Sequence, residues 1–82
     1  MLERHTCEAT LLAHLDWMRQ TMATLCRRHA MGHADTEDFV SWATLRLVEN
    51  DYGILRQFRG ECAVRTYLVV VVTRLFLDYC NA

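Results

Sequence analysis

Residues 65–72 read RTYLVVVV, and the secondary structure of this stretch decides the fold class. Four consecutive valines after a Tyr-Leu pair have the propensity of a buried β-strand. The stretch nevertheless lacks polar–apolar alternation, and no second convincing strand is present in the chain to pair with it. A lone strand cannot satisfy its backbone hydrogen-bonding groups. The valine run is therefore predicted to belong to a helix that extends from about residue 63 to the end of the chain.

A membrane span is the other interpretation of the valine run, and its length argues against it. From Val64 to Leu77 there are 14 residues, interrupted by two arginines and two threonines. A spanning helix needs about 20 mostly apolar residues. Thr66, Thr73 and Asp78 form a thin polar stripe on an otherwise apolar segment. This pattern predicts a central helix that the other helices wrap.

The first third of the chain also has the spacing of a helix. One apolar stripe, with members three and four residues apart, predicts a helix over about residues 8–30, and Gly32 is its expected stop. The members of the stripe are Leu11, Leu15, Met18, Met22 and Leu25.

A second long helix is expected to begin with Asp35 as its N-cap and to end at Asn50 and Asp51. Its two apolar strips predict either deep burial or one core face and one partner face. A short helical stretch is expected over residues 52–58, and Gly60 breaks it.

Composition agrees with a single helical domain. The 82 residues contain no proline and only three glycines, and 52% of them are hydrophobic. We therefore predict that residues 1–82 form one compact all-α domain of three to four helices. The net charge is −1, although residues 56–77 hold four arginines and one acidic residue. The chain thus has a modest basic segment on an acidic body, with arginine and aromatic residues interleaved as nucleic-acid binders use them.

The cysteines and histidines allow a metal-site hypothesis. Cys26, His29 and His33 have the spacing C-x2-H-x3-H, which would place zinc ligands on one face of a continuous helix. Gly32 is expected to end that helix before His33, so no metal or other cofactor is predicted, and the four thiols are expected to be reduced and mostly to serve in packing. The chain carries no phosphate loop or nucleophile elbow, and we expect a protein that is not an enzyme. Because no signal-peptide pattern is present, we expect a cytoplasmic protein.

The order of short motifs between residues 35 and 79 is more specific than any one of them. DTEDFVSWATLRLVENDYGILRQFRGECAVRTYLVVVVTRLFLDY resembles region 2 of bacterial RNA polymerase sigma factors of the extracytoplasmic-function type. The shared pieces are an acidic start, an apolar helix, an F-R-G turn, a T-Y-L helix start and a terminal L-D-Y.

The resemblance implies two binding surfaces and no catalysis. The helix after the acidic start would bind the beta-prime coiled coil of core RNA polymerase, and the last helix would recognise and melt the promoter minus-ten element. An anti-sigma factor is a further partner that the family allows. The implied polymerase-binding residues are Asp38, Ser41, Trp42, Thr44, Leu45 and Val48. The implied DNA-binding residues are Arg59, Arg65, Thr66, Tyr67, Val71, Arg74 and Asp78.

The chain also departs from the family pattern. Cys62 replaces a common capping serine, Val69 to Val72 stand where relatives carry polar or basic residues, and Cys80 and Asn81 replace a basic pair. The sequence stops before the basic loop of the family, so we expect a domain cut from a longer factor. The alternative is a small helical protein–protein interaction module without DNA binding, which the net charge and the valine run favour.

Overall fold

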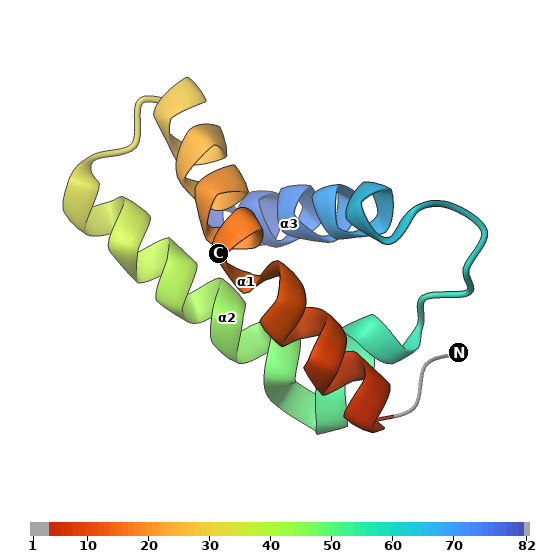
Figure 1. The fold of residues 1–82 in the computed structure, drawn as a ribbon. Coiled ribbons are helices and arrows are strands. Elements are labelled where there is room, and N and C mark those ends of the chain that lie inside the picture. Colours follow the sequence, from red (N-terminus) through yellow and green to blue (C-terminus); the bar gives the residue numbers. More distant parts are fainter. Residues whose placement is uncertain (1–3, 82) are drawn as a thin grey trace.

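The computed structural model describes residues 4–81, which form three helices and no strand (Figure 1). Helix α1 spans Arg4–Arg28, α2 spans His33–Arg56 and α3 spans Val64–Cys80. The all-α prediction is confirmed, and the valine run is helical as expected. Within the described range, no helix is long and apolar enough to cross a membrane.

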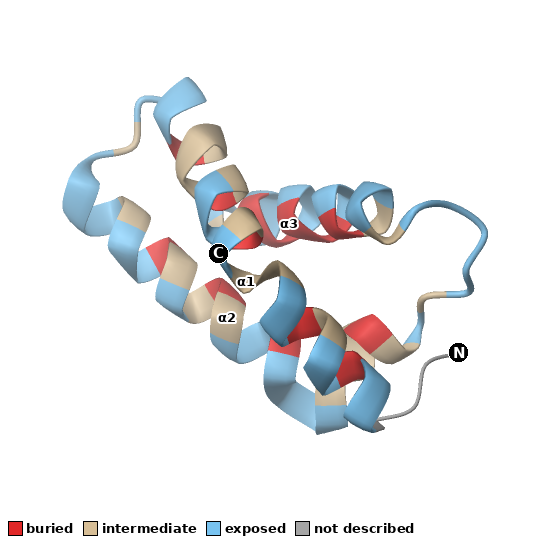
Figure 2. Cartoon of the chain, in the orientation of Figure 1, coloured by how far each residue is buried: buried red, intermediate tan, exposed pale blue. Residues whose placement is uncertain are grey.

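The core lies where α3 crosses the hairpin of α1 and α2. All three helices contribute to a single hydrophobic cluster. Its fully covered large side chains are Met18 and Met22 from α1, Phe39, Leu47 and Leu55 from α2, and Leu68 and Val72 from α3. Figure 2 shows that the buried residues of α3 face the hairpin and that its other side is exposed. The expectation of a central helix wrapped by the others is therefore wrong for the outer side of α3.

A tight backbone motif at its carboxyl end terminates α1. The amide N–H of Met31 donates to the carbonyl of Cys26 at 3.0 Å, and that of Ala30 donates to Arg27 at 3.1 Å. Ala30 has a φ of 55°, in the left-handed region. This is the Schellman arrangement, in which glycine is the usual left-handed residue. The stop is thus Ala30, and the prediction that Gly32 ends α1 is wrong.

Gly32 instead begins the next helix. It is the N-cap of α2, with extended backbone and no side-chain capping bond. Asp35 lies two residues inside the helix, so its predicted role as the N-cap is wrong. It still places negative charge in the first turn, where the helix dipole favours an acidic group.

The second helix is interrupted where the sequence predicted its end. Glu49 is extended, and Asn50, Asp51 and Tyr52 all have positive φ, before helical geometry resumes through Arg56. Left-handed geometry is costly for residues other than glycine, and asparagine and aspartate tolerate it best. A guanidinium N–H of Arg56 donates to the Asn50 carbonyl at 2.9 Å across the kink. After the kink, the last turn of α2 contacts the start of α3, where the Tyr67 hydroxyl donates to the Ile54 carbonyl at 2.7 Å.

Candidate functional site

The outer face of α2 holds four of the six predicted polymerase-binding residues at helical spacing. Asp38, Ser41, Leu45 and Val48 are all exposed, and 63% of Leu45 is accessible to solvent. The first half of this face continues into a hollow of about 570 Å³ between α2 and Arg19 of α1. Leu45 and Val48, one turn apart, together provide an exposed apolar surface that a protein partner can cover.

The other two predicted polymerase-binding residues, Trp42 and Thr44, are half-buried. Trp42 packs against Tyr79, with 5.1 Å between ring centroids, and against Phe39 at 6.3 Å. The Thr44 hydroxyl donates to a carbonyl of its own helix at 2.7 Å, and its side chain lines the hollow. Trp42 therefore joins α2 to α3, and the exposed face of α2 is the one carried by Leu45.

A groove between α2 and α3 brings together predicted DNA-binding residues that are spread over twelve positions of sequence. Its volume is about 200 Å³. Four of its lining residues, Tyr67, Val71, Arg74 and Asp78, come from the predicted DNA-binding set. Arg46, Ile54, Gln57, Val70 and Leu75 complete it. Two arginines, one carboxylate, one amide and one phenol therefore line a groove with apolar walls.

Tyr67 is fixed in the groove by two contacts. Its hydroxyl donates to the carbonyl of Ile54 at 2.7 Å, and its ring packs on Phe58 with 5.0 Å between centroids. Burial raises the pKa of the Tyr67 phenol, and the nearby Arg74 guanidinium partly opposes this shift. Tyr67 is therefore neutral at physiological pH and keeps its hydroxyl proton as a donor.

Val71 is too buried for the DNA-binding role that was predicted for it. Only 7% of its side chain is accessible, and it belongs to the hydrophobic core, so it forms the base of the groove and offers little surface for DNA. Its neighbour Val70 is exposed and lines the same groove. The helix rotates by about 100° per residue, so adjacent valines face different surroundings.

The remaining predicted DNA-binding residues lie elsewhere. Arg65 sits over the Trp17 ring on the α1 side, with its guanidinium carbon 5.0 Å from the ring centroid. Thr66 is exposed at the start of α3. Arg59 lines a smaller hollow of about 160 Å³ in the connection before α3, which it shares with Tyr67. The structure therefore does not gather the seven predicted residues into one surface.

Two polar groove residues, one in α2 and one just after it, were missed by sequence reasoning. Arg46 lies over the Trp42 ring at 5.5 Å and forms an ion pair with Glu49 at 3.3 Å. Gln57 follows the last turn of α2. The one available signal was the position of Arg46, one turn after Trp42 and next to Leu45. The sequence could not place Gln57, because its position depends on the kink.

The hypothetical metal ligands do not converge. Cys26 is buried, and both His29 and His33 are exposed on opposite sides of the turn between α1 and α2. His29 packs on Phe76, and His33 pairs with Glu37. Within residues 4–81, no three histidine, cysteine or acidic side chains form a metal-binding group. All four cysteines have free thiols.

Comparison with known proteins returned no match: no protein-family model, no curated protein and no solved structure is similar to this chain.

Proposed function

We propose that this chain is a sigma-factor region 2 domain, which binds core RNA polymerase through the outer face of α2 and minus-ten DNA through the α2–α3 groove. The proposal rests on the motif order of residues 35–79. The observation that carries it is the exposed face of α2, where Leu45 and Val48 lie uncovered on the helix that also exposes Asp38. Apolar residues surrounded by polar ones are typical of a protein-binding surface.

The groove has the chemistry to hold an unpaired base. Arg46 and Arg74 can meet phosphate oxygens, and Asp78 and Gln57 can accept or donate hydrogen bonds at a base edge. The groove is small, at about 200 Å³, and is lined by both charged and apolar side chains. A confined site of this kind is in keeping with recognition of a flipped nucleotide.

Polymerase binding is the first test. The 82-residue chain is titrated against labelled core polymerase and against its isolated beta-prime coiled coil. Leu45→Ala should weaken binding at least about ten-fold, as loss of a buried anchor does. Leu12→Ala is the matched control, because Leu12 is 66% exposed on α1 and should leave affinity unchanged. Absence of a complex with either form of polymerase refutes the proposal.

DNA binding is the second test. A single-stranded minus-ten oligonucleotide should bind more weakly as salt rises, because phosphate contacts release counterions. Arg74→Ala should weaken binding, and Arg19→Ala, which removes an arginine of α1 outside the groove, should not. Equal effects of the two substitutions would mean that the groove is not the DNA site.

A second candidate function is a helical protein–protein interaction module without a nucleic-acid role. The exposed apolar residues on the outer side of α3, Val69, Val70 and Leu77, favour it. Self-association in analytical ultracentrifugation, together with no binding to polymerase or DNA, would select this function over the first.

A further inference from the structure

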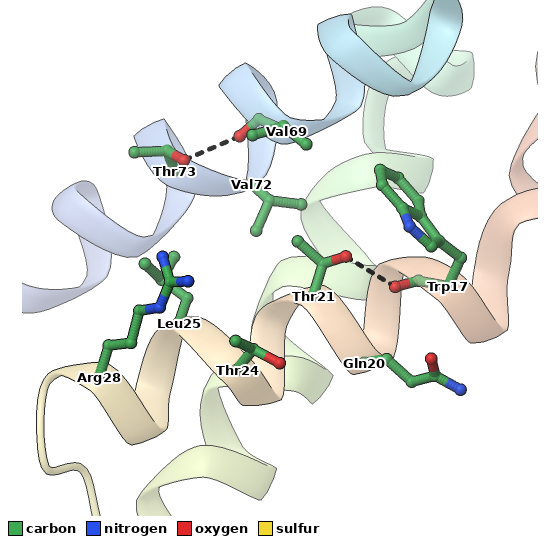
Figure 3. A pocket seen from close by; sticks show the side chains of 9 residues that line it. All are labelled: Trp17, Gln20, Thr21, Thr24, Leu25, Arg28, Val69, Val72 and Thr73. Atoms are coloured by element: carbon green, nitrogen blue, oxygen red, sulfur yellow. Dashed lines mark hydrogen bonds between the residues drawn. The ribbon is translucent and has the colours of Figure 1, made fainter.

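A second groove lies on the opposite side of α3, between α3 and α1, and neither proposed surface uses it. Its volume is about 360 Å³ (Figure 3). Six of its lining residues come from α1: Trp17, Gln20, Thr21, Thr24, Leu25 and Arg28. The other three are Val69, Val72 and Thr73 from α3.

The groove has an apolar centre, and two of its threonine hydroxyls already donate hydrogen bonds. Leu25 and Val72 lie between the helices, and Val69 is 42% exposed at the edge. The Thr21 hydroxyl donates to the Trp17 carbonyl at 2.9 Å, and that of Thr73 donates to Val69 at 2.8 Å, as the dashed lines in Figure 3 show. An occupant therefore gains mainly by burying apolar side chains.

The charged side chains at the groove are all basic. Arg28 lines it toward the carboxyl end of α1, and Arg65 covers the Trp17 ring toward the other end. Arg27 donates to the hydroxyl of Thr24 at 3.2 Å. Among the described residues, no acidic side chain lines this groove. An occupant with acidic flanks is therefore favoured by electrostatic complementarity.

Arginines can also bind nucleic acid, but the other contacts in this groove do not favour nucleic-acid binding. Non-specific single-strand binding depends on free aromatic faces on which bases stack. The guanidinium of Arg65 lies over the Trp17 ring, and His14 meets the same ring at 6.4 Å in an edge-on arrangement. The one aromatic ring that lines the groove is thus already engaged, and the Thr21 and Thr73 hydroxyls donate to backbone carbonyls.

From these observations we propose that the α1–α3 groove is a docking site for an acidic amphipathic helix of a partner protein. Apolar side chains of that helix, spaced three and four residues apart, pack on Leu25 and Val69, and Val72, which is only 1% accessible, forms the base of the groove. Its flanking carboxylates pair with Arg28 and Arg65 at the two ends. This site is separate from the polymerase face and the DNA groove, so it stands or falls independently of the proposed function.

The test uses two designed peptide probes of about four helical turns. Both carry leucines at positions i, i+3, i+4 and i+7, and the remaining positions are glutamate in one probe and lysine in the other. Each fluorescently labelled probe is titrated with the 82-residue chain, and binding is followed by anisotropy. The acidic probe should bind at least about ten-fold more tightly than its basic twin.

Two pairs of variants locate the binding site. Val69→Asp should weaken binding of the acidic probe at least about ten-fold, and Val70→Asp, an equally exposed neighbour outside the groove, should have little more than a general charge effect. Arg28→Glu should shift the preference toward the basic probe, whereas Arg19→Glu should not. Circular dichroism checks that each variant is folded, and Val69→Ala replaces Val69→Asp if that variant unfolds.

Several results would overturn the proposal. The first is that the two probes bind with equal affinity. The second is that Val70→Asp weakens binding of the acidic probe more than Val69→Asp does. The third is that the acidic probe does not bind at about 1 mM protein. Displacement of the acidic probe by a thymidine oligonucleotide, with the same sensitivity to Val69→Asp, would assign the groove to nucleic acid instead.

Discussion

The neighbouring valines of α3 offer a direct test of how this helix is oriented. Val71 is core and Val70 is 44% exposed, although both are valines in the middle of the same helix. Replacement of each by alanine removes the same two methyl groups. It also gives each position the same gain in helix propensity, about 0.5 kcal/mol. Any difference between the two variants therefore reports burial alone.

The expected magnitudes follow from the exposed fractions. Two buried methyl groups are worth about 1.6 kcal/mol of transfer free energy, and the cavity left behind adds to the loss at a core position. Val71→Ala should therefore lower the free energy of unfolding by about 2 kcal/mol after the gain in propensity. At Val70 about half of the transfer term is already absent, so Val70→Ala should change stability by less than about 0.5 kcal/mol.

Urea denaturation followed by far-UV circular dichroism measures both values, and unchanged m-values confirm that the transitions are comparable. A domain of this size has only about 4–12 kcal/mol of stability, so a loss of about 2 kcal/mol moves the midpoint clearly. Equal losses for the two variants, or a greater loss at Val70, would show that the helix is rotated from the orientation described above. Val71 would then not form the base of the α2–α3 groove.

Three further outcomes follow from the backbone motif and the buried titrating groups. Ala30→Gly should raise the free energy of unfolding by about 1 kcal/mol, because glycine adopts the left-handed conformation without steric cost, and Ala34→Gly inside α2 should lower it. Tyr67→Phe should cost about 1 kcal/mol in the same urea assay by removing the hydrogen bond to a backbone carbonyl, and no loss would mean that water replaces this bond. Burial raises the pKa of the Cys7 and Cys26 thiols above 9.0 and that of the Tyr67 phenol above 10.0. The folded chain therefore holds these protons more tightly than the unfolded chain, and stability should be steady below about pH 9 and fall as pH rises through the folded pKa values. A urea midpoint that rises above pH 9 would contradict this sign.

The helical fold could be predicted because the lack of a pairing strand outweighed the strand propensity of the valine run. The valine run has strand propensity, but a strand needs a partner and the chain offers none. The break at Asn50 and Asp51 was also predictable, since both residues tolerate left-handed geometry. The end of α1 was not, because Gly32 is the better left-handed residue by propensity, whereas the backbone bonds of Ala30 and Met31 close the helix at Ala30.

The candidate site was less accessible to sequence reasoning. Four adjacent valines have no polar member to mark which side of the helix is exposed, so the difference between Val70 and Val71 arises only when α3 packs. Arg65 and Arg74 are both cations of α3, yet they face different grooves. The participation of Gln57 depends on where the kinked end of α2 meets α3. Each of these facts depends on how the helices are placed relative to one another. The spacing of residues within one helix carries no information about that placement.

The two tryptophans of the chain occupy different helix interfaces, and this gives the molecule two optical reporters. Trp17 lies under a guanidinium where α1 meets α3, and Trp42 lies in a cluster of rings where α2 meets α3. In a pair of single-tryptophan variants, the emission of each would follow the separation of one interface. Coincident transitions would mean that both helices leave α3 in one step, and distinct ones would reveal which interface opens first.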